Sequence, residues 1–540
     1  MNTLADWIRH LSRHQQLPTD PLGRRRFLAQ SIWTAAALGI GAGATRTGFA
    51  QAAPRVRFVA QPFTLGVASG YPHPTGFSLW TRLAPAPLLA DGGIPGDDRI
   101  AVRCEIADDE GFRKIRQSID FETAPEVGHS VHLDIDGLEP ARTYFYRFQC
   151  GDAVSAVGRT HTLPTAGSAL ANYRIAFASC QNYEHGYFSA YRQMQRDAPD
   201  LVLFLGDYIY ESQWGTDLVR RHIGVEANTL AGYRTRHAQY KLDPDLQAMH
   251  RFGPWAFAWD DHEVDNDYAD EQSENLDPAF LLRRAAAYQA YFEHMPMPRR
   301  MFPRAREMRL YTHFDVGDLL RIYLLDDRQY RTPQPCPRPN RHSSQVWTQC
   351  TELRDPAQTL LGKSQEDWLQ ARFADSKTHW NLIGQQTLFA PMDEQPGPER
   401  GTWTDGWDGY PLARQRLMAD MQAARLHNPV IAGGDLHCNV VADVPGDPER
   451  FASAPVASEF CGTSLSAEAR PQSYYSERHA DNPHIHQLRS DQRGYTLLDF
   501  GRDRLQATLQ VVKDVHVREP EFEVQGRFVV ESGKAGVKPA

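Results

Sequence analysis

Two apolar runs that end in metal-binding side chains dominate the sequence between residues 174 and 211. The run RIAFAS precedes Cys180, and the run LVLFLG precedes Asp207 and Tyr210. A helix-like segment separates the two runs, which favours parallel strands of an open α/β sheet, and such sheets bind their ligands beyond the carboxyl ends of the strands. We therefore expect the chemistry at these two strand ends.

Two further segments have the same character. FAWDDHEVDNDYA, residues 257–269, and PVIAGGDLHCN, residues 429–439, both place polar side chains after an apolar stretch. Asp, His, Asn and Tyr groups that recur after successive strands suggest several cations held by loops at one edge of a sheet. The sequence predicts a metal centre with two or more ions.

Strands and helices alternate through residues 174–530. LVLFL, RIYLLD, HWNLIG and NPVIAGG are typical of buried strands, whereas KSQEDWLQARF, residues 363–373, and PAFLLRRAAAYQAYFEHM, residues 278–295, are typical of helices. This alternation predicts a catalytic domain of the α/β class over residues 174–530.

Residues 56–164 have a different pattern. Short alternating runs such as FSLWTRL, IAVRCEI and SVHLDI are separated by Gly, Pro and Asp, and LEPARTYFYRF carries Tyr144 and Tyr146 in the manner of a fibronectin-like sandwich. None of these residues has a catalytic character. We expect a small all-β domain here, joined by a polar linker to the catalytic domain.

Residues 1–52 are interpreted as an export signal. GRRRFLAQ, residues 23–30, places paired arginines before an Ala- and Gly-rich stretch without charge, and Ala50 and Ala52 offer a cleavage point. The stretch is too weakly apolar for a permanent membrane anchor. The pattern predicts a periplasmic or secreted protein that uses the twin-arginine export machinery, with a basic cytoplasmic linker as the alternative.

The net charge and the length of the chain limit the classes of function that it can have. The 540 residues are 41% hydrophobic, and 58 Lys and Arg against 67 Asp and Glu give a net charge of -9. The chain is long enough for a large core and more than one domain. It lacks the basic excess that binds nucleic-acid backbones, so no stable nucleic-acid complex is expected, although a nucleic acid could still be a substrate.

Seven cysteines leave at least one thiol unpaired. Cys336 and Cys350 lie close together in a Pro-rich stretch, and Cys104 and Cys150 fall in the same β domain, so both pairs are candidates for disulfides. For each pair, two reduced thiols are an equal alternative. Cys180 is the natural free thiolate.

The whole set of motifs resembles the PhoD-like alkaline phosphatases. Besides the segments above, the resemblance includes FTLGVASGYPHPTGFSLWTRLAP, LDDRQYRTPQPC, LGKSQEDWL, IGQQTLFAPM, DGWDGYPLARQRLM, EFCGTSLSA and NPHIHQLRSDQRGYTLLDF, in the order that family shows. It implies the calcineurin-like metallophosphoesterase fold, a two-sheet sandwich flanked by helices. It also implies hydrolysis of small-molecule phosphomonoesters and phosphodiesters with the help of metals.

The resemblance also implies a ligand set. Cys180, Asp207, Tyr210 and His437 are expected on iron, with Asp207 bridging to calcium, and Asp435 together with Asp261 or Asn266 would complete the calcium shell. A thiolate and a phenolate suit Fe³⁺, whereas carboxylate and amide oxygens suit one or two Ca²⁺ ions. Ser179 and Cys180 stand where the wider fold has its first metal-binding Asp and His. Taken singly, each of these residues has an ordinary structural explanation, and their joint occurrence after successive strands favours the metal site.

A mechanism follows from these metals. Metal ions can lower the pKa of a bound water from ~15.7 to about 7, which makes hydroxide available to attack phosphorus in line, without a phosphoenzyme. His262 is the candidate to protonate the leaving oxygen or to contact phosphate. Arg328 is the candidate for a two-pronged clamp on phosphate oxygens.

Two alternatives remain open from the sequence. The protein could be a dedicated phosphodiesterase or a phospholipase D-like enzyme, because the motifs define the metals better than the substrate pocket. It could also be an exported metal-binding protein without turnover, a class that the β domain suggests. A panel of monoesters, diesters and phospholipids separates these alternatives.

Overall fold

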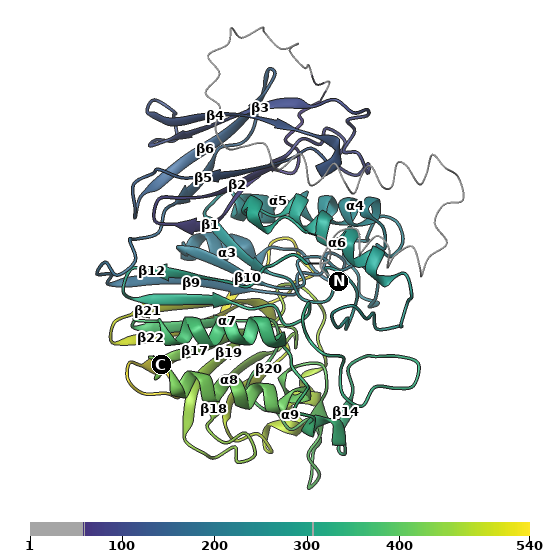
Figure 1. Ribbon diagram of the computed structural model, residues 1–540, viewed down its shortest axis with the longest axis vertical. Coiled ribbons are helices and arrows are strands. Elements are labelled where there is room, and N and C mark those ends of the chain that lie inside the picture. Colours follow the sequence, from purple (N-terminus) through teal and green to yellow (C-terminus); the bar gives the residue numbers. More distant parts are fainter. Residues whose placement is uncertain (1–57, 59, 305–306) are drawn as a thin grey trace.

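Two mixed β-sheets, the helices around them and an N-terminal β-sandwich make up the protein (Figure 1). The computed structural model describes residues 58, 60–304 and 307–540, so the predicted export signal in residues 1–52 lies outside the described part. In that part, none of the helices combines the length and the apolar character needed to cross a membrane.

The N-terminal sandwich confirms the predicted all-β region. One layer contains β3 (Ile100–Ala107), β4 (Ile115–Thr123), β6 (Thr143–Cys150), β7 (Ala153–Val154) and β8 (Gly158–His161). The facing layer contains β1 (Val67–His73), β2 (Gly76–Arg82) and β5 (Ser130–Ile135). Alternate residues of β6, including Tyr144 and Tyr146, are buried in the core between the layers.

The ten-stranded sheet continues from the sandwich, because β1 pairs in parallel with β11. Its other strands are β9 (Asn172–Ala178), β10 (Leu201–Leu205), β11 (Pro254–Ala258), β21 (Arg493–Gly501), β22 (Arg504–Val512), β23 (Phe522–Glu531) and β24 (Lys538–Pro539). Gly70 lies at the β1–β11 junction, where a Cβ atom would approach the carbonyl oxygen of Pro296 to 2.4 Å. A side chain would collide there, so only glycine allows β1 to lie this close to Pro296.

The parallel strands β9, β10 and β11 form the centre of this sheet. Every residue of β10 and β11 is buried, which explains why their sequences are continuous apolar runs rather than alternating ones. The three strands therefore bring their carboxyl ends to the same edge.

The seven-stranded sheet packs against the first one. It contains β12 (Thr312–Val316), β13 (Leu320–Leu324), β15 (Trp380–Gly384), β17 (Pro429–Gly433), β18 (Asn439–Pro445), β19 (Pro455–Cys461) and β20 (Ile485–Arg489). β13, β15, β17 and β19 are parallel. Leu203 of the first sheet and Leu324 and Phe460 of the second belong to one buried core, so the two sheets share their apolar faces.

Helices cover the outer faces of the two sheets. They are α3 (Ala190–Asp197), α4 (Leu230–Lys241), α5 (Pro244–His250), α6 (Phe280–His294), α7 (Gly362–Ala374), α8 (Pro411–Ala423) and α9 (Gln472–His479). α4, α5 and α6 lie between the sandwich and the first sheet, and α7 and α8 cover the second sheet (Figure 1). α6 and α7 match the helices predicted from sequence, and the predicted α/β class is confirmed.

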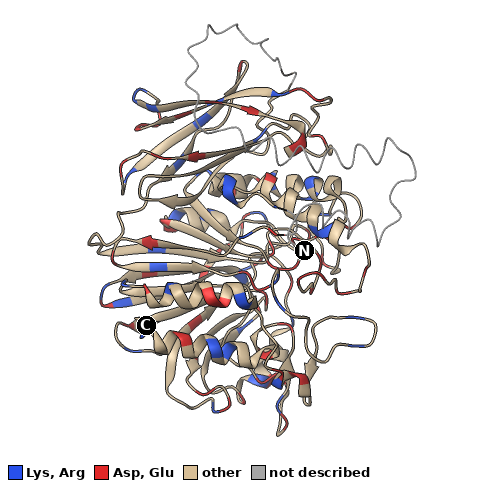
Figure 2. Cartoon of the chain, in the orientation of Figure 1, with Lys and Arg blue, Asp and Glu red and all other residues tan. Residues whose placement is uncertain are grey.

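The remaining short elements lie in connecting segments. They are η1 (Pro125–Val127), η2 (Arg299–Met301), η3 (Thr351–Arg354), η4 (Trp407–Gly409), β14 (Val346–Trp347) and β16 (Thr402–Trp403). On the face drawn in Figure 2, Lys and Arg are interspersed with Asp and Glu, consistent with the absence of a basic excess in the sequence. The expectation of no stable nucleic-acid complex stays a prediction.

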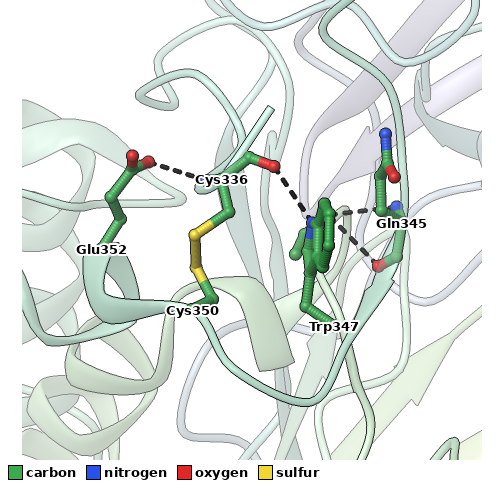
Figure 3. The surroundings of a disulfide bond; sticks show 6 residues. Cys336, Gln345, Trp347, Cys350 and Glu352 are labelled. Carbon is green, nitrogen blue, oxygen red and sulfur yellow. Dashed lines mark hydrogen bonds between the residues drawn. A yellow bond between two sulfur atoms is a disulfide. The ribbon is translucent and has the colours of Figure 1, made fainter. Parts of the chain in front are cut away.

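One of the two predicted disulfides is present. Cys336 and Cys350 are bonded, and the backbone N–H of Cys336 donates to the Glu352 carboxylate while its carbonyl accepts from the Trp347 indole (Figure 3). The other candidate pair is not formed: Cys104 and Cys150 are free and buried. In the β3–β6 register Cys104 lies opposite Phe148, so Cys150 is two residues out of register. Cys180 is free, as predicted.

Basic side chains are buried where the sandwich meets α4 and α6. An Arg82 Nη1 lies 2.8 Å from Nε2 of His294, whose ring stacks 5.0 Å from that of His237. Lys241, one turn after His237, lies 3.2 Å from the Tyr208 hydroxyl. Both ring nitrogens of His237 lack a hydrogen-bond partner among the described residues. Burial first, and then the charges of Lys241 and Arg82, lower the pKa of His237 well below its usual value of 6.5.

This depressed pKa predicts a specific dependence of stability on pH. Below about pH 6.5 the unfolded chain protonates His237 and the folded chain does not, so its contribution to stability is lost as the pH falls. The slope is about 1.4 kcal/mol per pH unit for one histidine. The free energy of unfolding of His237→Phe, measured with urea, is therefore expected to fall less steeply between pH 7 and pH 5 than that of the parent protein. The difference should be about 1.4 kcal/mol per pH unit. The exposed His427→Phe should leave the slope unchanged, and an unchanged slope in His237→Phe would contradict the prediction.

Candidate metal centre

The carboxyl ends of strands from both sheets carry the predicted site residues. Cys180 follows the end of β9 by two residues, Asp207 follows β10 by two, and Asp261 follows β11 by three. From the second sheet, Asp435 follows β17 by two residues. These four residues therefore lie beyond the carboxyl ends of the strands, which is where the sequence predicts the site residues.

The backbone at these positions adopts a conformation that ordinary residues avoid. Cys180, Asp207, Asp435 and His437 have φ angles of 57°, 57°, 65° and 54°. Left-handed backbone at a residue with a side chain costs about 1–3 kcal/mol and persists where the surroundings enforce it, often at functional sites. The sharp turns direct four side chains away from their strands and into a common space.

The first group of side chains contains Cys180, Asp207 and His437, whose ligand atoms lie within 4.8 Å of one another. The Tyr210 hydroxyl donates to Asp207 Oδ2 at 2.9 Å and lies 3.1 Å from His437 Nε2. His437 Nδ1 contacts the Glu468 carbonyl, so Nε2 is the nitrogen that faces the group. Burial lowers the pKa of His437 to about 3, which keeps the ring neutral and able to bind a metal.

Two more groups continue from the first, one through Asp207 and the next through Asp261. Asp207, Asp261 and His262 form one, and Asp260, Asp261 and Asp435 form the other, each within 4.8 Å. Asp207 and Asp261 thus each belong to two groups. Asp207 and Asp261 would therefore be placed to hold neighbouring ions together, as in a centre with more than one ion.

The donor set fits metal cations. Four buried carboxylate oxygens of these groups lack a hydrogen-bond partner among the described residues: Asp207 Oδ1, Asp260 Oδ2, Asp261 Oδ1 and Asp435 Oδ2. Burial raises the pKa of Asp207 and of Asp435 well above the usual range, and burial followed by the Asp207 charge does the same for Cys180. Unpaired buried anions are costly, and metal ions would compensate them.

Arg328 is fully buried within the acidic side of the site. Its guanidinium pairs with Asp260 and, at 2.6 Å, with Asp405. Nη2 has no hydrogen bond in the described part of the chain and lies 3.7 Å from Asp261 and 3.8 Å from Asp435. Nε and Nη1 are therefore used by carboxylates, whereas Nη2 faces Asp261 and Asp435.

His262 is partly accessible, with 14% of its side chain exposed. Its Nδ1 is 2.7 Å from Glu211 Oε2, and its ring lies 4.3 Å from that of Tyr210. Burial alone would lower the pKa of His262, but the carboxylates of Glu211, Asp207 and Asp261 together outweigh it and hold the pKa well above the usual value. The side chain of Asn266, the other predicted calcium ligand, interacts with Glu274, and its role stays a prediction.

Glu263 holds the loops of the site together. Its carboxylate accepts from the backbone N–H groups of Asp207 at 3.0 Å, Tyr208 at 2.5 Å and Asp260 at 2.9 Å. Because these residues follow β10 and β11, the contacts fix the spacing between two strand ends. Burial is the main reason that the pKa of Glu263 rises to about 8.

Sequence reasoning did not select several residues that the structure adds to the site. Asp260 precedes Asp261 directly, Glu211 follows Tyr210, and Asp405 lies in the DGWDGYP segment. Each belongs to a motif that was recognised, but the partner of each is distant in sequence: Arg328 is 68 residues from Asp260 and 77 from Asp405. No local signal identified them as partners.

Comparisons with known proteins agree with this geometry. Residues 175–509 match the family described as PhoD-like phosphatase, and residues 48–164 match the family described as its N-terminal domain. The chain is 39% identical to alkaline phosphatase D from Bacillus subtilis (strain 168), over 99% of this chain and 91% of that protein. It shares a shorter segment, 16% of this chain at 34% identity, with purple acid phosphatase 23 from Arabidopsis thaliana.

A solved structure of PhoD superposes with a TM-score of 0.85 at 40% sequence identity. The superposition covers 90% of this chain and 93% of the other. The similarity therefore extends over both the sandwich and the two-sheet region rather than over a single motif. On these findings, the chain belongs to the PhoD-like phosphatase family.

Proposed function

We propose that the protein is an exported phosphoesterase that hydrolyses phosphomonoesters and phosphodiesters at a centre of one ferric ion and one or two calcium ions. Family membership makes it a hydrolase of phosphoric ester bonds. The observation that carries the finer proposal is the sharing of Asp207 between a group with Cys180 and His437 and a group with Asp261 and His262.

The two sides of the site differ in donor chemistry. The thiolate, phenolate and imidazole of Cys180, Tyr210 and His437 would hold iron, whereas the carboxylates of Asp261 and Asp435 would hold calcium. Asp207 would bridge the two. When bound, such ions lower the pKa of water and neutralise phosphate oxygens.

His262 would supply the proton to the leaving oxygen. Because Nδ1 is bound to Glu211, Nε2 is the nitrogen left to contact substrate. The raised pKa of His262 favours the protonated ring near neutral pH, as a general acid requires. Glu211 itself is oriented by the backbone N–H of Asn266 at 3.2 Å, so it is a positioning residue.

Glu211→Gln tests this role. The amide would no longer stabilise the imidazolium, and kcat is expected to fall by about 10- to 100-fold, part of the 10²–10⁴-fold that general acid catalysis contributes. The loss should be greater for an alkyl ester than for a p-nitrophenyl ester, since p-nitrophenolate needs little protonation. The matched control is Glu226→Gln, a more exposed acid that pairs with Arg283. An equal loss for both esters would assign Glu211 a purely structural role.

Export is supported by the disulfide as well as by the arginine pair in residues 23–30. The Cys336–Cys350 bond is typical of an oxidising compartment. We infer a periplasmic or secreted enzyme delivered by the twin-arginine machinery without a permanent anchor. Cell fractionation after Arg24→Lys and Arg25→Lys should find the unprocessed chain inside the cell; unchanged export would contradict this route.

The direct test of function is hydrolysis of p-nitrophenyl phosphate and bis(p-nitrophenyl) phosphate by the metal-loaded protein across pH, with a phospholipid in parallel. Turnover of both p-nitrophenyl esters supports the proposal. A preference for the phospholipid alone would support the phospholipase D-like alternative. Full metal content without turnover of any ester would favour a metal-binding protein without activity.

A further inference from the structure

An exposed tryptophan stands beside the candidate metal centre. Trp214 lies on the segment between β10 and α4, and 37% of it is exposed. Its indole ring is 6.3 Å from the ring of Tyr210 and 6.4 Å from the ring of His437, to which it is inclined by only 15°. The indole therefore borders two of the expected iron ligands and also contacts solvent.

The backbone at Trp214 is held in place. The N–H of Glu468 donates to His185 Nδ1 at 3.0 Å, so His185 carries its hydrogen on Nε2 and donates it to the Trp214 carbonyl at 2.9 Å. The His185 ring also meets the indole edge-on at 4.2 Å. Gly215 follows with φ at +82°, where a Cβ atom would lie 2.7 Å from His185 Nε2. The position of the indole is thus defined by the fold.

Other apolar side chains of the same segment are exposed. Val225 is 84% exposed and Ile223 is 45% exposed. The Gln213 side chain lies 3.4 Å from the carbonyls of both His222 and Gly224, which ties this turn to the residue before Trp214. Exposed apolar side chains therefore lie on the same segment as Trp214.

We propose that Trp214 forms the subsite for a planar aromatic group of the substrate, so that the enzyme prefers phosphate esters that carry an aryl ring or a nucleobase. This inference rests on the proposed phosphoesterase function and names its substrate class. Because the indole borders Tyr210 and His437, the organic part of an ester whose phosphate is bound at the proposed centre would meet the exposed ring. Stacking on an aromatic side chain accepts any planar ring without specific hydrogen bonds.

Trp214→Leu keeps an apolar side chain and removes the aromatic face. We expect kcat/KM to fall about 10-fold for p-nitrophenyl phosphate and for a nucleoside 5′-monophosphate, mainly through KM, and less than 2-fold for glycerol phosphate. Trp214→Phe should restore most of the loss. A loss confined to the nucleotide would identify the nucleobase as the recognised ring, and a loss confined to p-nitrophenyl phosphate would identify the aryl group.

Trp347 provides the matched control, because it is also 37% exposed and lies in the disulfide-bonded segment. Trp347→Leu should leave all three substrates unaffected. As a readout independent of turnover, nucleoside monophosphate should quench part of the tryptophan fluorescence of the parent protein, and Trp214→Phe should remove that part. Equal losses for aromatic and alkyl esters, or unchanged quenching, would overturn the inference. Absence of turnover in the metal-loaded parent protein would instead contradict the proposed function.

Discussion

Asp207→Asn is expected to reduce kcat/KM for both monoester and diester substrates. The reduction should exceed the roughly 10- to 100-fold loss that is typical when a residue hydrogen-bonded to a metal ligand is replaced. Asp207 is shared by two groups of donor atoms, and it accepts a hydrogen bond from the Tyr210 hydroxyl. An amide has the same shape but cannot bridge two cations as an anion. Metal content should therefore fall together with activity.

The control for Asp207→Asn is Asp217→Asn, a side chain that is 85% exposed in the segment after β10. This variant should keep the activity and the metals of the parent protein. If Asp207→Asn kept both its full metal content and its kcat/KM, Asp207 would not be a metal ligand. Elemental analysis and kinetics on the same preparation provide both readouts.

Arg328→Met is expected to lower the free energy of unfolding by about 3–5 kcal/mol, the range for removing one partner of a buried ion pair. The thioether fills much of the volume of the guanidinium but leaves the fully buried carboxylate of Asp260 without its cation, and that of Asp405 with Arg331 alone. Asp260 should be affected most, because Arg328 is its only ion-pair partner among the described residues, whereas Asp405 keeps Arg331. Urea unfolding at constant metal content measures the loss.

Arg103→Met tests whether the effect depends on burial. Arg103 pairs with Asp120 on the surface, where the side chains are 53% and 71% exposed, and such pairs contribute about 0–1 kcal/mol. If Arg328→Met were as stable as the parent protein and raised KM instead, Arg328 would act as the phosphate clamp predicted from sequence. Nη2 faces Asp261 and Asp435, so it is the nitrogen that would contact phosphate. KM reports this second role, and the free energy of unfolding reports the ion pairs.

Local patterns were sufficient to predict the central strands of both sheets and the sheet edge at which the candidate site residues meet. The apolar runs before Cys180 and Asp207 are β9 and β10, and the segments 278–295 and 363–373 match α6 and α7 to within two residues at each end. Buried parallel strands have such continuous runs because both of their faces are covered. Side chains that follow these runs must lie at one edge of the sheet, so the structure brings together Cys180, Asp207, Asp261 and His437, as expected.

Features that depend on register or on distant pairs were not accessible in this way. Cys104 and Cys150 both belong to the sandwich, but a two-residue offset between β3 and β6 separates them. The pairing of Arg328 with Asp260 and Asp405 requires segments from both sheets to meet. Trp214 carried no periodic signal, and its relation to His437 appears only when the segment after β10 is placed beside β17.

Counting iron and calcium in the purified protein, beside Cys180→Ser, tests the central claim most directly. The claim predicts about one iron and one or two calcium ions per chain in the parent protein, because the thiolate and phenolate donors suit Fe³⁺ and the carboxylates suit Ca²⁺. It also predicts loss of iron in Cys180→Ser, whose hydroxyl is a far weaker donor. Iron at the same level in both proteins, or no iron in either, would contradict the proposed mixed-metal centre.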